Sequence, residues 1–337
     1  MKAFIKAIEY YLPDGILDNA QLARDFPEWD AEKIEAKTGI RQRHMAAPGE
    51  CASDMAVAAA EKLFASGACR PGDIDYVLLC TQSPDYFLPT TACVLQQRLG
   101  LPSTCGAFDF NLGCSGFVYG LGLAKGLIET GQARNVLLVT AEAYSKFIHP
   151  GDKSVRALFG DAAAATLVSA AESEVESIGP FVYGTDGSGA RNLIVPAGGT
   201  RQFFDPDAPT RVDADGNIRS DNHLFMDGPE IFSFTLRVVP KTVTELLALA
   251  GLDMEDVDLW VFHQANRFML DHLRRKIGIP VERFPINMAD CGNTVSSTIP
   301  IVLHEQIASG ALAPGKTIAL IGFGVGYSWA GTILRWC

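Results

Sequence analysis

The segment at 107–128, AFDFNLGCSGFVYGLGLAKGLI, contains a short apolar run, a turn that carries Cys114, and a longer stretch of apolar and small residues. The run at 107–110 predicts a buried strand, and the helical spacing at 117–128 predicts a helix that ends near Gly131. The unpaired amides and positive dipole end of that helix would lower the pKa of the Cys114 thiol and stabilise an oxyanion. The position favours a nucleophile, although most unpaired cysteines are simply small buried residues.

Two later segments place further polar side chains where strands end and helices begin. His263-Gln264-Ala265-Asn266 follows an apolar run at 259–262, and Gly292-Asn293-Thr294 precedes another expected helix. In isolation such a histidine is more often a core residue, and such an asparagine is more often a helix N-cap. Their order after Cys114 favours a shared pocket that holds a thiol, an imidazole and a carboxamide.

These three segments and three others form an ordered set that resembles a known family. The others are TGIRQRH at 38–44, FGDAA at 159–163 and GFGVGYSW at 322–329. The set resembles the β-ketoacyl-[acyl carrier protein] synthase III family, condensing enzymes of the thiolase superfamily. It extends over nearly the whole chain.

The apolar runs at 76–80, 136–139, 259–262 and 317–321 each follow a helical stretch, which predicts an α/β fold. Residues 72–78 are echoed by 255–261, and 128–138 by 307–320, at offsets near half the chain. The resemblance implies a thiolase-like five-layered αβαβα fold with two similar halves. We expect the halves to be 1–172, which carries the cysteine, and 173–337, which carries the histidine and asparagine.

The resemblance also implies the chemistry of the site. Cys114 would attack an acyl thioester, and His263 and Asn293 would stabilise the enolate formed as malonyl-[acyl carrier protein] loses carbon dioxide. The backbone amides of Cys114 and Val325 would form the oxyanion hole. The product would be a β-ketoacyl-[acyl carrier protein], as in fatty acid biosynthesis.

The resemblance assigns substrate contacts to a further set of side chains: Phe87, Phe159, Asn266, Phe323, Lys37 and Lys153. Phe87 would cross a homodimer interface and close the partner's acyl pocket. Lys37 and Lys153, with Lys33, stand where the family has Trp and Arg residues that hold coenzyme A. Lysine loses the stacking and the bidentate fork of arginine, so we expect looser coenzyme A binding and a primer that arrives on the carrier protein.

Arg267, Arg274 and Arg275 fall near one face of the helix expected after Asn266, where the family binds its acidic carrier protein. A solvated helix face is the more usual meaning of such charges.

Composition limits the partners and the compartment. The 337 residues have a net charge of −11 and a pI of about 5.0, which argues against nucleic acid as a partner. Eight cysteines without a Cys-x-x-Cys pair indicate no metal site or redox motif, and they suit a reducing cytoplasm. No apolar run approaches the ~18 residues of a membrane span. We expect no cofactor beyond the thioester substrates.

Rival functions make different demands on the sequence. A thiolase needs a second catalytic cysteine in the C-terminal glycine-rich segment, and 322–331 contains none. A plant-type polyketide synthase has a longer chain and a different segment after its histidine. Acyl transfer without decarboxylation and a non-catalytic acyl-binding scaffold remain open. The segment at 213–217, DADGN, resembles a calcium loop, but its glycine is misplaced and a surface turn is expected.

Overall fold

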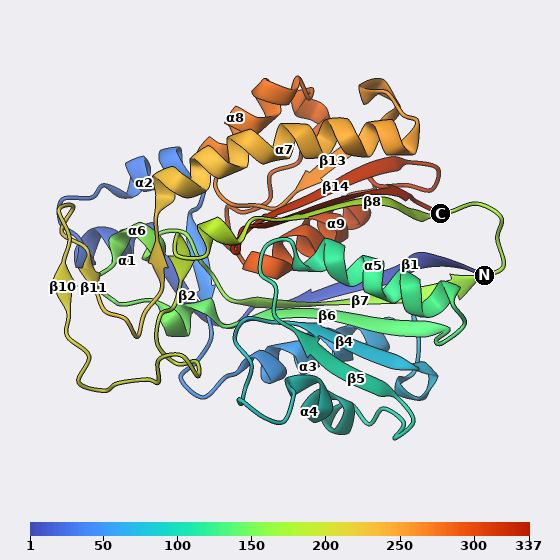
Figure 1. Ribbon diagram of the computed structural model, residues 1–337, viewed down its shortest axis with the longest axis horizontal. Helices are drawn as coiled ribbons and strands as arrows, with labels where there is room; N and C mark the ends of the chain where they lie inside the picture. Colours follow the sequence, from blue (N-terminus) through green and yellow to red (C-terminus); the bar gives the residue numbers. More distant parts are fainter.

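Two stacked β-sheets frame the molecule in the computed structural model, which describes residues 1–337 (Figure 1). The first sheet has the order β1-β7-β6-β4-β5 and the second the order β13-β14-β15-β8. The strands of the first are β1 (Lys2–Tyr11), β4 (Tyr76–Cys80), β5 (Gly106–Phe110), β6 (Asn135–Glu142) and β7 (Ala162–Ala171). Those of the second are β8 (Ile178–Thr185), β13 (Leu259–Phe262), β14 (Thr317–Gly324) and β15 (Ser328–Arg335).

Helices form the other three layers. The central pair, α5 (Gly116–Glu129) and α9 (Thr298–Ala308), contacts strands of both sheets. The outer face of the first sheet is covered by α3 (Ala52–Ala65) and α4 (Thr91–Arg98), and that of the second by α7 (Gly228–Ala250) and α8 (Arg267–Ile277) (Figure 1). The strands β6 and β7 are covered on both faces, which explains their continuous runs of apolar and small residues. The predicted five-layered αβαβα fold is confirmed.

The two sheets repeat one topology. The order β1-β7-β6-β4 corresponds to β8-β15-β14-β13, with one parallel and two antiparallel pairings in each series. The echoed segments 72–78 and 255–261 take equivalent places, because each enters the last strand of its series, β4 or β13, through a 3₁₀ turn. The first sheet has one strand more, β5, at its edge. The predicted duplication is confirmed.

The halves nevertheless share one core. A single buried cluster contains Phe117 and Leu138 from the first half together with Leu259, Ile318 and Leu320 from the second. The chain passes from β7 to β8 at 172–177, where the boundary was expected. The division into 1–172 and 173–337 as separate domains stays a prediction.

Shorter helices and strands lie together at one end of the two sheets (Figure 1). Asp213 accepts hydrogen bonds from the backbone N–H groups of Asp215 and Asn217 and from the Arg219 guanidinium, which forms the expected surface turn. No helix has the length and apolar character needed to cross a membrane. These elements are α1 (Asn19–Asp25), α2 (Ala31–Thr38), α6 (Lys153–Arg156), β2 (Gly15–Asp18), β3 (Gln42–Met45), β9 (Leu193–Ile194), β10 (Arg211–Val212), β11 (Ile218–Arg219) and β12 (Phe225–Met226).

One expectation about local structure is wrong. The apolar run at 317–321 predicts a strand that ends at Ile321, but β14 continues to Gly324, and only 325–327 turn into β15. The strand continues because Gly322 and Gly324 pair with Ala330 and Ser328 of β15.

Candidate active site

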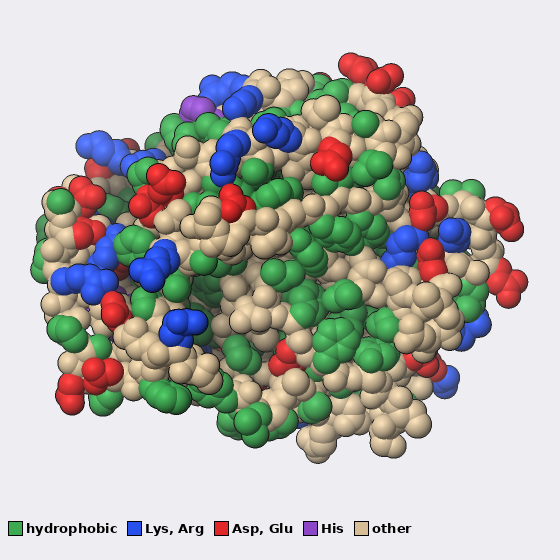
Figure 2. Space-filling model, viewed as in Figure 1, with side chains coloured by type: hydrophobic (Ala, Val, Ile, Leu, Met, Phe, Trp, Pro, Cys, Tyr) green, Lys and Arg blue, Asp and Glu red, His purple; other side chains and the backbone are tan.

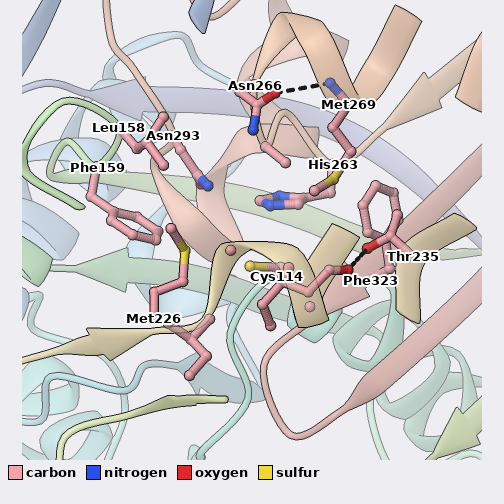
Figure 3. A pocket seen from close by; sticks show the side chains of 15 residues that line it. Cys114, Leu158, Phe159, Met226, Thr235, His263, Asn266, Met269, Asn293 and Phe323 are labelled. Carbon is pink, nitrogen blue, oxygen red and sulfur yellow. Dashed lines mark hydrogen bonds between the residues drawn. The ribbon is translucent and has the colours of Figure 1, made fainter. Parts of the chain in front are cut away.

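Cys114 lies where β5 gives way to α5, and its side chain is buried. It lines a cavity of about 80 Å³ with His263, Asn293 and other residues from both halves. Figure 3 shows the imidazole and the carboxamide converging over the sulfur of Cys114. The lining is completed by Leu158, Phe159, Leu193, Met226, Gly228, Ile231, Thr235, Ala265, Asn266, Met269, Phe323 and Gly324.

The pKa of the Cys114 thiol is raised, whereas a lowered pKa was expected. Burial raises its pKa to about 12, and the charge of Glu142 acts in the same direction. The backbone N–H groups of Val325 and of Cys114 itself hydrogen-bond the sulfur and oppose this shift, but they do not outweigh the loss of water. The resting nucleophile is therefore a neutral thiol that two amides face.

Glycines let the end of β14 lie directly against this thiol. A Cβ atom at Gly324 would lie 2.8 Å from both Cβ and Sγ of Cys114, and one at Gly322 would lie 2.8 Å from Cα of Ser115. The hydroxyl oxygens of Ser115 and Ser328 are 2.6 Å apart and tie the cysteine turn to β15. This close approach brings the Val325 amide to the sulfur.

His263 follows β13 and is a neutral base. Its Nδ1 lies 2.8 Å from the Thr298 hydroxyl, and burial lowers its pKa to about 3. With Nδ1 engaged, Nε2 remains for a ligand in the cavity.

Asn293 is held by its own carbonyl oxygen. Its Oδ1 accepts a hydrogen bond of 2.9 Å from the backbone N–H of Val295, which leaves Nδ2 directed into the cavity (Figure 3). Val295 has a φ of 55°, a left-handed conformation that is costly for a β-branched residue. Backbone strain is thus stored beside the carboxamide.

Asn266 serves two purposes. Its Oδ1 caps α8 by accepting a 2.9 Å hydrogen bond from the Met269 N–H, and its side chain also lines the cavity (Figure 3). Phe159 and Phe323, to which the resemblance assigned substrate contacts, lie on the cavity wall. The apolar residues Leu193, Met226 and Met269 and the polar Thr235 were not foreseen, because no local pattern separates a pocket wall from ordinary core.

Comparison with known proteins supplies the family. Residues 108–187 match the family described as 3-oxoacyl-[acyl-carrier-protein (ACP)] synthase III, and residues 247–336 match its C-terminal part. A β-ketoacyl-[acyl-carrier-protein] synthase III of Caldanaerobacter subterraneus subsp. tengcongensis is 36% identical over 326 residues, which cover 97% of this chain and 95% of that protein. The chain belongs to the β-ketoacyl-[acyl carrier protein] synthase III family.

Other members of the synthase III family agree. A synthase III of Streptomyces coelicolor is 38% identical, with 96% of this chain and 94% of that protein covered. A crystal structure of a 3-oxoacyl-(acyl-carrier-protein) synthase III is 57% identical and has a TM-score of 0.98, with both chains covered in full. The chain is therefore an enzyme of the condensing type.

Three side chains to which the synthase III resemblance assigned substrate contacts lie away from this cavity. The side chain of Phe87 is 69% exposed, and Lys37 is exposed on α2. Lys153 is engaged elsewhere, since its Nζ lies 2.6 Å from a carboxylate oxygen of Glu28. None of the three lines the cavity that holds Cys114.

The arginines of α8 have unequal surroundings. Arg267 and Arg275 are exposed, whereas Arg274 donates a 3.1 Å hydrogen bond to the carbonyl of Ile279 just beyond the helix. The guanidinium of Arg274 is therefore committed to the end of its own helix. Lys276, which was not singled out from the sequence, is exposed beside Arg275 and donates to the carbonyl of Leu236 on α7.

Proposed function

We propose that this enzyme condenses an acyl thioester with malonyl-[acyl carrier protein], with loss of carbon dioxide, and yields a β-ketoacyl-[acyl carrier protein] through an acyl-Cys114 intermediate. The observation that carries the proposal is the meeting of Cys114, His263 and Asn293 in one apolar cavity. The printed names of the relatives, which specify 3-oxoacyl or β-ketoacyl carrier-protein synthases, support the same substrate class.

In the first half-reaction the sulfur of Cys114 attacks the acyl carbonyl. The bond between the acyl carbon and the donor sulfur breaks, and the thiol proton leaves with the departing thiol. The N–H groups of Cys114 and Val325 stabilise the tetrahedral oxyanion, a role supported by their hydrogen bonds to the sulfur. The small apolar cavity favours a short acyl group.

In the second half-reaction Nε2 of His263 and Nδ2 of Asn293 donate hydrogen bonds to the malonyl thioester carbonyl. The bond to the carboxylate breaks, carbon dioxide leaves, and the enolate carbon attacks acyl-Cys114, from which the sulfur departs. For Nε2 to donate, Nδ1 must accept the Thr298 hydroxyl proton, so this hydroxyl must turn from the Val295 carbonyl, 3.1 Å away, to Nδ1, 2.8 Å away. Burial keeps His263 neutral, so its single ring proton must lie on Nε2 for this role.

The carrier protein is proposed to bind on the exposed face of α8. Asn266 and Met269 line the cavity from the start of this helix, and Arg267 in its first turn and Arg275 in its last turn are exposed. An acidic carrier needs such a local basic patch on an enzyme of net charge −11. The pairing of Lys153 with Glu28 supports weak coenzyme A binding, and no cofactor is proposed.

A homodimer is proposed through the free edge of β5. Phe87 and its neighbours Tyr86 and Leu88 are exposed apolar side chains, and their loop is joined through Thr91 to Asp109 of β5. Figure 2 shows hydrophobic groups gathered over α5. Phe87 would then close the partner's acyl cavity. The eight free cysteines support a cytoplasmic location.

The proposal is tested by incubating the enzyme with an acyl-coenzyme A, or the same acyl group on carrier protein, together with malonyl-carrier protein. Mass spectrometry should find the β-ketoacyl-carrier protein and an equal amount of carbon dioxide. Transfer of the acyl group to an alcohol or amine without carbon dioxide would support the ester- or amide-forming alternative. Binding of the acyl thioester with no turnover would support a scaffold.

A further inference from the structure

Glu142, the last residue of β6, is completely buried, and the mechanism above does not use it. Its hydrogen-bond partners are all uncharged. Oε2 accepts a 3.0 Å bond from the backbone N–H of Gln82 and lies 3.4 Å from the Ser83 hydroxyl, and Oε1 lies 2.9 Å from the Ser296 hydroxyl. A buried carboxyl with these partners requires an explanation, because burial of an acid without a cation is costly.

The first group of partners supports the turn that carries Cys114. Gln82 donates from Nε2 to Oδ1 of Asn111 at 3.1 Å. It also packs against Gly113, where a Cβ atom would lie 2.5 Å from its Oε1. Glu142 therefore holds the backbone of Gln82. The Gln82 side chain in turn contacts the 111–113 segment, which leads into Cys114.

The second partner belongs to the segment that carries Asn293. Ser296 directly follows Val295, whose N–H holds Asn293 and whose backbone is in the left-handed region. Two residues further on, Thr298 contacts Nδ1 of His263. A strained segment keeps its conformation only where neighbouring groups hold it in place. The hydrogen bond between Ser296 and Glu142 is one such contact.

We infer that Glu142 is a positioning residue for the second half-reaction: it joins the 293–298 segment to the Gln82 segment and so holds Asn293 and His263 over Cys114. This inference rests on the proposed function for its kinetic consequence. Both oxygens accept hydrogen bonds, Oε2 from the Gln82 N–H and Oε1 from the Ser296 hydroxyl. A neutral acid keeps this acceptor capacity and adds one O–H donor.

The surroundings of Glu142 favour its neutral form. Burial raises the pKa of Glu142 to about 8, and the nearby charge of Asp161 adds to the shift. Its other titratable neighbours are Cys80, Cys114 and Tyr144, which are buried groups without positive charge. An ionised Glu142 would also oppose the negative charge that develops on the substrate enolate.

The test compares Glu142→Gln, which keeps a donor and an acceptor in the same shape, with Glu142→Met, which keeps only the volume. In Glu142→Met, kcat for malonyl decarboxylation should fall on the order of 10²-fold, and by more than the rate of acylation, while KM changes little. Glu142→Gln should restore most of the decarboxylation rate. Ser296→Ala, a milder variant, should lower the same rate, and its effect should not add to that of Glu142→Met.

Amide hydrogen exchange of residues 293–298 gives a second readout that does not depend on activity. Exchange should rise in Glu142→Met and stay near the wild-type level in Glu142→Gln. Equal loss of decarboxylation in both variants would overturn the inference, because it would mean that the reaction needs the carboxyl group of Glu142 rather than its hydrogen bonds. Unchanged exchange in Glu142→Met would also overturn it. Absence of decarboxylation in the wild-type enzyme would refute the proposed function and leave the exchange comparison decisive for Glu142.

Discussion

Cys114 is a buried thiol that meets backbone amides rather than a cation. Its place at a strand-to-helix turn could be predicted from the sequence, because an apolar run and a helical pattern flank it. Its raised pKa could not, since desolvation depends on the walls that distant segments build around the sulfur. Helix amides favour the thiolate here, but complete burial costs more.

Alkylation of Cys114 by iodoacetamide should therefore stay slow at neutral pH and rise about tenfold per pH unit up to at least pH 10, because the raised pKa keeps the thiol protonated below that range. Peptide mapping after timed exposure at each pH measures the rate. Exposed Cys93 provides an internal control. A plateau between pH 6 and 8 would instead indicate a thiolate at rest.

At the scale of elements, the hairpin of β14 and β15 determines how closely the second half approaches the nucleophile. Gly324→Ala should place a Cβ atom within van der Waals overlap of Cys114 and lower the acylation rate on the order of 10²-fold by displacing the sulfur. Gly126→Ala is the matched control, because a Cβ there meets nothing within 4 Å. Single-turnover acylation measures both variants, and equal rates would refute the close-approach argument.

Two arginines of α8 have different surroundings: Arg274 donates to a backbone carbonyl, and Arg275 is exposed. Arg275→Glu should raise KM for malonyl-carrier protein by about fivefold, which corresponds to ~1 kcal/mol, because it reverses a charge at the proposed docking surface. Arg274→Ala should leave KM unchanged and lower Tm by a few degrees, since it removes the bond to the Ile279 carbonyl. Steady-state kinetics and thermal unfolding distinguish the two. The reverse pattern would place the carrier at Arg274.

The sequence predicted elements better than it predicted their contacts. The strands at 76–80 and 259–262 have the predicted bounds because each is an uninterrupted apolar run. The strand β14 runs past its predicted end because pairing with β15 overrides the loop preference of its glycines. Glu142, Ser296 and Thr298 were missed as parts of the site, because their importance comes only from partners far away in the chain.

At the scale of the whole molecule, two halves and a partner subunit are proposed to build one site. Phe87→Asp should convert the dimer to a monomer, because it places a charge in an apolar interface. Val281→Asp is the control, since Val281 is also exposed but lies after α8 on the outer face of the second sheet. Light scattering measures the mass of each variant. A monomeric wild-type enzyme, or a Phe87→Asp variant that stays dimeric, would contradict the proposed interface.

The central claim is that one cavity performs two separable half-reactions, with Cys114 in the first and with His263 and Asn293 in the second. Intact-mass spectrometry tests it in the wild-type enzyme and in His263→Ala and Asn293→Ala, first after an acyl thioester and then after malonyl-carrier protein. All three proteins should gain one acyl group, mapped to Cys114, and only the wild-type enzyme should lose it at once. Each variant should retain the adduct on the order of 10²-fold longer. An adduct on another cysteine, or histidine and asparagine variants that cannot be acylated, would contradict the account.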